Sequence, residues 1–562
     1  LIFDRAGRWV AREQISDLDV PATLQSLLAS RIDALDPNTR SVAMVSSVIG
    51  RDVDTDLLLD VLGGEKHRVE MLDAISDLEA HGVMKLVSTS PHITFRFRHA
   101  LLHDVVYESM LRRRRREVHH EVARAIERTY PERLTDLAPV LARHFSEAGD
   151  VSAALEYTFT AADESMARHA THEARQFYLD GLALAEKGST DVDEQTRLRL
   201  GIGAARAGIR FTPGEESLEI LSELQKAAEA LGDADLTGQV YGLILTVRTM
   251  GSEWYGDDGF RDVMDKAFAL APSISDPGLS AALTGLKGQV LRTQDEFVEA
   301  AGLMSRAVQP LQDAGLITDA AMNAILTADV LGQHGDFAAA HDWIERGASL
   351  AARSGNPTAI ADSNLIKGRL LATEGNVEEA LVHTQRGMEL AADAENLYCE
   401  LVGNFLVADQ QLRLGDAESA IPHLEKSFEL GEYCNAAGFM MLGRAWIASA
   451  RAQLGDLDPD GYTQSLDEAV AARSRSGEAA VRLHRAIAMS ATPEPDWSSA
   501  FADFERSIEL LDEIEARPDH ARAMHAYAMA LDSAGRPDGV AKLAQASDLL
   551  ERLGMSAEAP AL

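Results

Sequence analysis

The stretch HGDFAAAHDW, residues 334–343, places a Gly-Asp pair between two apolar segments and decides the fold. The same pattern returns every 40 residues, as EGNVEEALVH (374–383), LGDAESAIPH (414–423) and LGDLDPDGYT (454–463). A glycine in this position ends one helix in the left-handed conformation, and the Asp or Asn after it caps the next helix. The spacing therefore predicts one helical hairpin in each 40 residues.

Related stretches extend the pattern in both directions. They are AGDVSAALEY at Gly149, YGDDGFRDVM near Gly256, TQDEFVEAAGL near Asp295, EPDWSSAFADF at Asp496 and AGRPDGVAKL at Gly535. Alanine recurs five residues after the glycine, at Ala154, Ala340, Ala380 and Ala420, where a small side chain lets two helices approach closely. One hairpin cannot bury its apolar face alone, so neighbouring hairpins must stack. We expect an all-α solenoid of ten or eleven hairpins over residues 136–562.

This pattern resembles tetratricopeptide repeats, although its period of 40 residues exceeds their usual length of about 34. The extra residues would lengthen the helices, as in the repeat arms of large bacterial regulators. Residues 200–260 are less regular, and Trp254 and Tyr255 lie in an interruption there. An aromatic pair in a repeat usually packs inside a loop, and the alternative is that the two rings project into a ligand groove.

Charge is distributed unevenly along the chain. The 562 residues hold 53 Lys and Arg against 89 Asp and Glu, a formal net charge of −36. Residues 1–150 hold 24 acids and 20 bases (net −4), which leaves −32 for the rest. So acidic a chain repels polyanions, which makes nucleic acid an unlikely general partner. Its strongly negative field suits basic or cationic partners.

The composition indicates a cytoplasmic location. The two cysteines, Cys399 and Cys434, are far apart and form neither a metal motif nor a disulfide framework, which fits a reducing cytosol. No uncharged apolar stretch reaches the roughly 18 residues that a membrane-spanning helix needs, and we find no signal peptide.

Residues 20–135 have a different pattern from the repeats. Apolar periodicity predicts helices at 24–35 and 42–48, a short helix in DTDLLLDVLG (54–63) and a fourth in EMLDAISDLEAHG (70–82). Two strands follow, the second in ITFRFRHA (93–100). Helices followed by a two-stranded wing predict a winged helix.

The amino-acid sequence of this region closely resembles one protein family. VPATLQSLLASRIDAL (20–35), SVIGRDV (47–53), FRFRHALLHDVVYESML (95–111) and RRREVHHEVARAIE (114–127) are similar to the segment after the nucleotide-binding domain in bacterial signal-transduction ATPases with numerous domains. The likeness is strongest to actinobacterial proteins that add an adenylate or guanylate cyclase domain. It covers residues 1–190, and across the solenoid it is architectural only.

The resemblance implies chemistry that these residues do not contain. No G-x-x-x-x-G-K-[ST] phosphate loop occurs, no cyclase aspartate pair can be placed, and there is no G-x-S-x-G elbow. We therefore expect this chain to be no enzyme and to bind no cofactor or metal. ATP and Mg²⁺ would belong to an upstream ATPase domain in cis. Because the chain opens at Leu1 with what reads as a strand pair, we expect residues 1–19 to be the end of that domain.

Five consecutive arginines stand in MLRRRRREVHH, residues 110–120. Five helical residues sweep about 400°, so they cannot share one face. An apolar stripe through Leu101, Val105, Leu111, Val118, Val122 and Ile126 would place Arg114 or Arg115 on the buried side, with its head seeking a carboxylate. We expect a charged connecting helix that pairs with Glu108, Glu117 and Glu121. If Arg112, Arg113 and Arg116 bind a partner, an acidic protein surface is favoured over DNA.

The histidines give weak signals. His99 and His103 stand four apart, but Ala100 replaces the glutamate of a zincin motif, and no third ligand follows at a set spacing. His119 and His120 are adjacent and should point apart. A metal site is therefore not predicted.

Together these patterns predict a regulatory arm of a cytoplasmic signal-transduction ATPase, which binds a protein or a small effector in the repeat groove. One alternative is a large ATPase-type transcriptional regulator, and another is a stand-alone protein-interaction scaffold. The sequence leaves open the upstream domain, the ligand, the oligomeric state and the sign of regulation.

Overall fold

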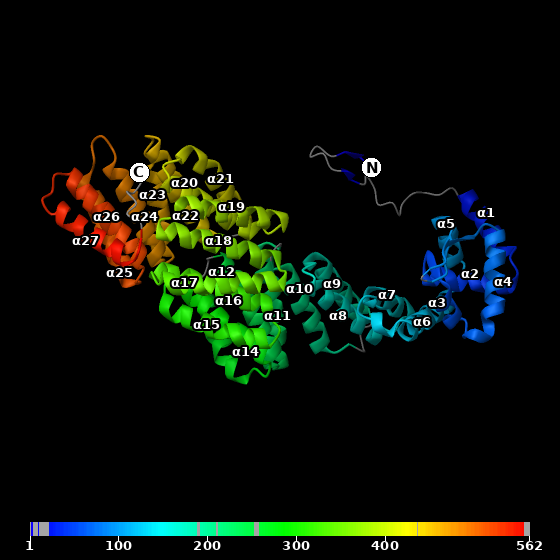
Figure 1. Ribbon diagram of the computed structural model, residues 1–562. Helices are drawn as coiled ribbons and strands as arrows, with labels where there is room; N and C mark the ends of the chain where they lie inside the picture. The colour runs from blue at the N-terminus through cyan, green and yellow to red at the C-terminus, as the bar shows by residue number, and fades with distance from the viewer. Residues whose placement is uncertain are drawn as a thin grey trace. The chain divides into compact units, whose positions relative to one another are not determined.

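The computed structural model is built almost entirely of α-helices (Figure 1). It describes residues 2–3, 9–10, 22–90, 92–187, 192–209, 212–251, 258–434 and 436–555. The chain divides into two compact units, Leu1–Leu200 and Gly201–Leu562. This division falls inside the predicted solenoid, and the domain boundary that the sequence suggests near residue 135 stays a prediction.

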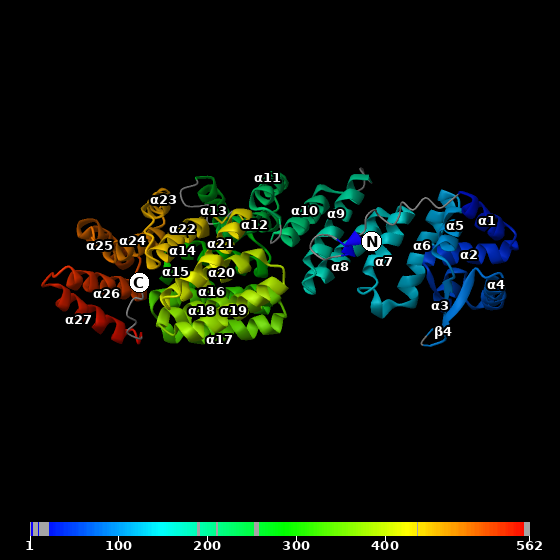
Figure 2. The same ribbon diagram turned by 90° about the horizontal axis from the view of Figure 1, so that it is seen from above.

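The first unit begins with a helical module that carries a small sheet. Its helices are α1 (Ala22–Asp33), α2 (Pro37–Ile49), α3 (Thr55–Val61) and α4 (Arg68–Ala80). The strands β3 (Asp52–Asp54), β4 (Met84–Ser88) and β5 (Thr94–Phe97) form an antiparallel sheet in the order β3-β5-β4, with β4 packed beside α4 (Figure 2). The expected wing had two strands. The structure adds a third strand, β3. It is too short to show an alternation of apolar and polar residues in the sequence, and its pairing with β5 stabilises it.

A separate strand pair precedes this module, and helices follow it. Strand β1 (Ile2–Phe3) pairs antiparallel with β2 (Trp9–Val10), as expected from the sequence. The helices after the sheet are α5 (Ala100–Glu108), α6 (Arg112–Thr129), α7 (Ala138–Ala148), α8 (Val151–Ala167), α9 (Thr171–Lys187) and α10 (Glu194–Gly208).

The arginine-rich segment forms two helices with a break between them, and this changes its buried face. Helix α5 ends at Glu108 and α6 begins at Arg112. Because the helix is interrupted, the apolar residues of α5 and those of α6 do not form one continuous stripe. The expected stripe is wrong on the α5 side, where Leu102 and Val106 are buried, and Leu111 is 80% exposed. On α6 it is right, because Val118, Val122 and Ile126 are buried as expected.

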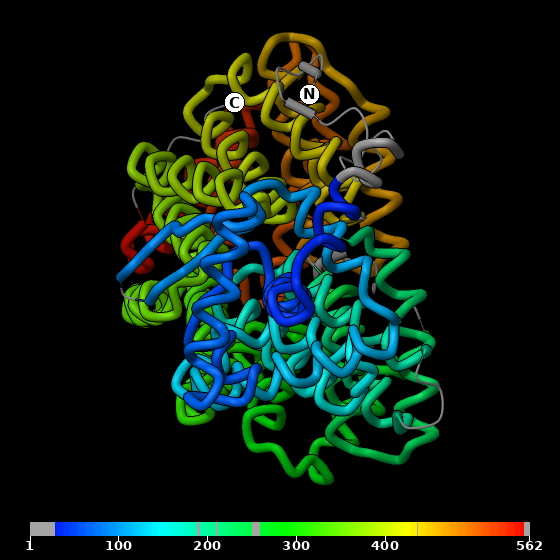
Figure 3. The backbone as a smooth tube through the Cα atoms, turned by 90° about the vertical axis from the view of Figure 1, so that its right-hand side faces the viewer, coloured from blue at the N-terminus to red at the C-terminus, as the bar shows by residue number. Residues whose placement is uncertain are grey.

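The second unit is a stack of antiparallel helical hairpins. Its helices before the regular repeats are α11 (Gly214–Leu231), α12 (Ala234–Gly251), α13 (Asp258–Leu270), α14 (Pro277–Thr293) and α15 (Phe297–Asp313). The regular repeats contain α16 (Ile317–His334), α17 (Phe337–Ser354), α18 (Pro357–Glu374), α19 (Val377–Asp393), α20 (Leu397–Arg413), α21 (Ala417–Cys434), α22 (Ala437–Gln453), α23 (Pro459–Ala471), α24 (Arg475–Ser490), α25 (Trp497–Glu513), α26 (Arg517–Ser533) and α27 (Gly539–Arg552). Along this unit the hairpins follow one another around a turn (Figure 3).

The glycine of each repeat ends a helix as the sequence predicts. Gly335, Gly375, Gly415 and Gly455 all have positive φ, between 77° and 100°. The capping role of the next residue is less uniform. Asp336 and Asp416 accept backbone N–H bonds, Asn376 makes no side-chain cap, and Asp458 rather than Asp456 caps α23.

The alanine five residues after the glycine is buried in each of these hairpins. Ala154, Ala340, Ala380 and Ala420 have no exposed surface. The all-α solenoid predicted from the repeat is thus confirmed, with its hairpins held together by small buried side chains.

Replacing Ala340 by Leu should destabilise the second unit by about 1–3 kcal/mol, because the added carbons have no space between the two helices. The matched control is Ala338→Leu, since Ala338 lies exposed on the same helix. We expect thermal unfolding followed by circular dichroism to show a clear loss of Tm only for A340L. Equal Tm values for the two variants would contradict this account of hairpin packing.

Candidate functional site

A pocket of about 240 Å³ lies inside the second unit. Its wall comes mainly from the first helices of the later hairpins, α20, α22, α24 and α26, and α16 adds Gln333. Carbon side chains such as Leu483, Ile487 and Leu511 make up most of the wall, and the rest is polar. A largely apolar cavity with a few placed polar groups is the usual form of a binding site for small ligands.

An aromatic and acidic group forms one wall of the pocket. The Trp446 indole N–H donates to Asp409 Oδ1 at 2.8 Å, and Arg413 Nε donates to Oδ2 at 2.9 Å. Burial opposes the charge on Asp409, but Arg413 and the indole outweigh it, so the pKa of Asp409 lies below its usual value. The His484 ring lies against Trp446 at a tilt of 32°, with centroids 4.0 Å apart. Asp409 is therefore a paired carboxylate at this wall.

Two hydroxyl groups form a hydrogen-bonded chain that ends at His484. Ser449 Oγ lies 2.9 Å from His484 Nδ1 and 2.9 Å from the Tyr462 hydroxyl. Desolvation lowers the pKa of His484 to about 4, and burial raises the pKa of Tyr462 to about 12. Both groups are uncharged near neutral pH and present hydrogen-bonding atoms to the pocket.

One repeat position supplies the inner polar groups. Asp329, Arg369, Asp409 and Ser449 each precede the repeat glycine by six residues, and so they are 40 apart. Gln333, Arg413 and Gln453 each precede it by two residues and line the pocket. None of these residues is among those predicted from the sequence. A polar residue recurring within an apolar helix at a fixed repeat position is the signal that would have found them.

The C-terminal hairpins close against earlier ones beside the pocket. Arg475 Nη2 donates to the Gln294 carbonyl at 2.8 Å, and the Ser476 N–H donates to Asp295 Oδ2 at 3.1 Å. Burial raises the pKa of Asp295, although Ser476 and Arg475 favour its charged form. Arg522, in the pocket wall, donates to the carbonyl of Ala372 at 3.1 Å. These contacts join residues about 150–181 apart in the sequence and enclose the pocket.

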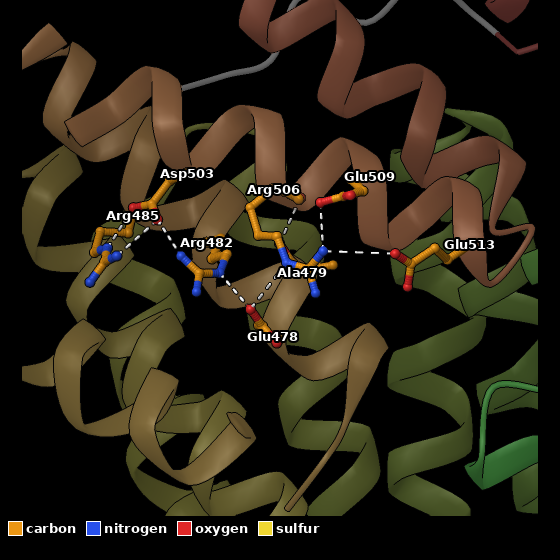
Figure 4. A network of polar contacts seen from close by, with 9 residues as sticks. Glu478, Ala479, Arg482, Arg485, Asp503, Arg506, Glu509 and Glu513 are labelled. Atoms are coloured by element: carbon orange, nitrogen blue, oxygen red, sulfur yellow. Dashed lines mark hydrogen bonds and ion pairs between the residues drawn. The ribbon is translucent and has the colours of Figure 1, made fainter. Parts of the chain in front are cut away.

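An ionic network holds the helix that carries much of the pocket wall (Figure 4). Arg482 and Arg485 on α24 both donate to the buried Asp503 on α25, over distances of 2.6–2.8 Å. Arg506 extends the network to Glu478, Glu509 and Glu513. Residues 478, 482 and 485 face this network, whereas residues 480, 483, 484 and 487 line the pocket. The network therefore orients α24.

The arginines predicted as a possible interaction site lie on α6 in the first unit. Arg112, Arg113 and Arg116 are exposed, and Arg113 pairs with Glu117. Arg114 pairs with Glu117 and Glu121, as expected of a charged helix. No described contact brings these arginines to the pocket, and Trp254 and Tyr255 lie outside the described residues.

Arg115 is the half-buried arginine of the run, but it does not reach a carboxylate as the sequence analysis expected. Its guanidinium lies 4.3 Å from the centroid of the Tyr107 ring and donates to the Met110 carbonyl. The break between α5 and α6 brings the aromatic ring and a free carbonyl to this point. The expected salt bridge of this residue is therefore wrong, and a cation–π contact replaces it.

Two histidines form a buried pair in the first unit. His119 Nδ1 lies 2.9 Å from His144 Nδ1, and His119 Nε2 lies 3.0 Å from the Tyr107 hydroxyl. His119 is buried and its neighbour His120 is exposed, so the two point apart as expected. Desolvation, with Arg143 and Arg115 adding to it, lowers the pKa of His119 to about 4. Desolvation and His119 lower that of His144 to about 3.

Among the described residues, the geometry of a metal group occurs only at Asp54, Asp56 and His92, and not at His99 and His103. Asp54 already has structural roles there. It caps α3 and accepts the Tyr130 hydroxyl at 2.8 Å. We therefore assign no metal to this cluster. In the described part of the chain, no helix combines the length and the apolar character needed to cross a membrane.

Comparison with known proteins shows the fold. No family model matches the chain. It is similar to an uncharacterized protein of Rhizobium meliloti strain 1021, with 28% identity over 208 residues, which are 35% of this chain and 20% of that relative. The chain thus spans about a fifth of the length of the curated relative that it matches.

Two solved structures have similar helical repeats. The crystal structure of a Rap protein complexed with competence and sporulation factor has a TM-score of 0.50 and 15% identity, over 63% of this chain and 99% of that one. A signal-transduction ATPase with numerous domains and a tetratricopeptide repeat sensor, from Pyrococcus horikoshii, has a TM-score of 0.36 and 11% identity, over 94% of this chain and 65% of that one. The likeness to the Rap protein, at 15% identity, shows the fold alone, which is a tetratricopeptide-like solenoid.

The buried histidine pair should make the first unit sensitive to acid. Both histidines have a pKa in the folded state that is lower than the value of 6.5 in the unfolded chain. As the pH falls from about 6.5 towards 4, the unfolded state therefore binds protons before the folded state does, which lowers the free energy of unfolding. At pH 5 each histidine should cost roughly 2 kcal/mol of stability relative to pH 7. His119→Gln should lose less stability than the wild type between pH 7 and pH 5, in urea titrations at the two values. His120→Gln, at an exposed site, should behave like the wild type, and an H119Q variant with the full wild-type loss would disprove the assignment.

The Asp503 network should be needed for the last hairpins. Asp503→Asn removes the carboxylate that two half-buried arginines share. This change should lower the free energy of unfolding by about 3–5 kcal/mol. We expect faster hydrogen exchange at the amides of α24 and α25. Glu509→Gln, at an exposed pair of the same network, should cost less than about 1 kcal/mol. Equal exchange rates in the two variants would mean that Asp503 does not orient α24.

Proposed function

We propose that this chain is the sensor arm of a cytoplasmic signal-transduction ATPase, and that the pocket in its second unit binds the effector. The observation that carries the proposal is the pocket of about 240 Å³, several of whose polar groups come from equivalent positions of different repeats. A ligand that contacts several hairpins at once favours one curvature of the solenoid, which is how a binding event becomes a change of shape.

The first unit would connect this sensor to the ATPase. In this proposal residues 1–19 are the end of the ATPase domain, residues 20–135 are a winged helix, and residues 136–562 are the sensing solenoid. The order of α2, β3, α3, α4, β4 and β5 supports a winged helix with β4 and β5 as its wing. ATP and Mg²⁺ would be bound by the ATPase domain, and a nucleotide cyclase could be a further part of the same protein.

A protein partner on the arginine run of α6 is a secondary part of the proposal. Arg112 and Arg116 are exposed beside Leu111, which is also exposed. The neighbouring Arg113 and Arg114 already pair with glutamates of their own helix, which leaves few charges to follow a nucleic-acid backbone. An acidic protein surface therefore suits this site better than DNA, and a transcriptional regulator that binds DNA here is the less favoured alternative.

Sequencing the coding DNA upstream of Leu1 tests the association with an ATPase. We expect an open frame that encodes a phosphate loop and, beyond it, a cyclase domain. A stop codon directly before a start codon at Leu1 would leave a stand-alone scaffold and overturn the proposal.

In that longer protein, filling the pocket should change ATP hydrolysis. Leu483→Trp places an indole in the pocket and should hold the arm in one state, which shifts the hydrolysis rate at least threefold in either direction. Val540→Trp is the matched control, because Val540 is 68% exposed on α27. Equal rates in L483W, V540W and the wild type would show that the pocket does not regulate the ATPase.

A further inference from the structure

The hydroxyl group of Ser449 determines which nitrogen of His484 carries the proton. Its oxygen lies 3.0 Å from the Ala445 carbonyl, 2.9 Å from the Tyr462 hydroxyl and 2.9 Å from His484 Nδ1. A carbonyl oxygen can only accept, so the one hydroxyl proton of Ser449 goes to Ala445. The Tyr462 hydroxyl and the Nδ1–H group of His484 then both donate to the Ser449 oxygen, which has two lone pairs.

This arrangement leaves the second nitrogen of His484 as an unprotonated acceptor. Desolvation lowers the pKa of the ring to about 4, and a neutral imidazole carries one proton only. The other nitrogen, Nε2, has no hydrogen-bond partner among the described residues, and yet it is not fully buried. Because His484 lines the pocket, this lone pair is open to a ligand.

Gln333 offers a second acceptor in the pocket wall. Its amide nitrogen donates to Asp329 Oδ2 at 3.3 Å, since a carboxylate can only accept. The amide oxygen has no hydrogen-bond partner among the described residues and is not fully buried either. Gln333 also lines the pocket, so both open polar groups favour a ligand that donates hydrogen bonds.

The charged groups of the pocket wall are paired with one another. Arg413 donates to Asp409 at 2.9 Å, and Arg522 donates to Asp519 at 3.3 Å. Burial lowers the pKa of His525, also in the wall, so this ring adds no charge near neutral pH. An ionic ligand would lose its hydration without meeting an unpaired opposite charge, which is costly. The wall therefore favours a neutral ligand.

Carbon surface makes up most of the remaining wall. It comes from Phe297 on α15, Leu483 and Ile487 on α24, Leu511 on α25 and Leu550 on α27. The apolar part of a ligand would thus contact hairpins that are far apart in the sequence.

From this arrangement we infer that the pocket binds a neutral, largely apolar molecule that carries a hydroxyl or N–H group, and that this group donates a hydrogen bond to His484 Nε2. The inference rests on the proposed function and narrows the class of effector. A ligand of the same shape without the donor would cover the acceptor and leave it unpaired, so it should bind less tightly.

Isothermal titration calorimetry with five probes that share one apolar body tests the inference on the chain of 562 residues. The probes are 2-naphthol, 2-methoxynaphthalene, 2-acetylnaphthalene, 2-naphthoate and 2-naphthylmethylammonium. The first has a hydroxyl donor, the next two have acceptors only, and the last two are charged. We expect 2-naphthol to bind at least fivefold more tightly than each of the others at neutral pH, because it alone is neutral and carries a donor.

Variants then locate the acceptor. His484→Phe should abolish the preference for 2-naphthol over 2-methoxynaphthalene, because Phe keeps a ring at this place but has no acceptor. His383→Phe is the matched control and should keep the preference, since α19 contributes no described residue to the pocket wall. Folding of each variant is confirmed by circular dichroism. Ser449→Ala gives a second reading if H484F does not fold, because either ring nitrogen can then carry the proton and the preference should shrink.

The possible results separate this inference from the proposed function. Equal binding of 2-naphthol and 2-methoxynaphthalene would overturn the hydrogen bond, and tighter binding of 2-acetylnaphthalene would show that Nε2 carries the proton. Tighter binding of either charged probe would overturn the neutral class of ligand. A preference that persists in both H484F and S449A would overturn the assignment of His484. Failure of all five probes to bind would also overturn the class of ligand, while regulation of ATP hydrolysis through L483W would remain a separate result.

Discussion

The close packing of two helices within each hairpin is the constraint on which this structure depends. An isolated hairpin has too little core, so its apolar face must be covered by its neighbours. The alanines at Ala340, Ala380 and Ala420 bring the paired helices together without a cavity, and the glycine before each one reverses the chain. Because every hairpin repeats this geometry, the stack acquires a constant turn, and the first helices of the hairpins come to face a common interior.

That interior explains why charged groups can occupy buried positions. Asp329, Arg369 and Asp409 lie at one repeat position, inside the turn, where water is largely excluded. Such groups are stable only when opposite charges meet, and most of them do. Asp329 pairs with both Arg292 and Arg369, so its buried negative charge is offset.

The contacts that close the second unit join hairpins that are far apart in the sequence. The seam joins Arg475 and Ser476 to the loop at Gln294 and Asp295, and Arg522 to the end of α18, through hydrogen bonds. A buried apolar cluster also crosses the seam, with Phe297 and Met304 on one side and Leu510 on the other. Because such hydrogen bonds contribute only about 1 kcal/mol each, the apolar cluster supplies much of the stability of the seam.

The sequence by itself determined the repeat, because a glycine with positive φ and a small residue at a helix crossing are requirements of the local backbone. It also located most helices of the first unit, since their apolar periods are long enough to read. It did not locate β3, because that strand depends on its pairing with β5. It also did not locate the break at Ser109–Leu111, which shifted the buried face of α5 and placed Arg115 over the Tyr107 ring. The pocket was decided only by tertiary structure. Asp329, Arg369, Asp409 and Ser449 are 40 residues apart along the chain, and only the turn of the solenoid makes them neighbours of one interior space.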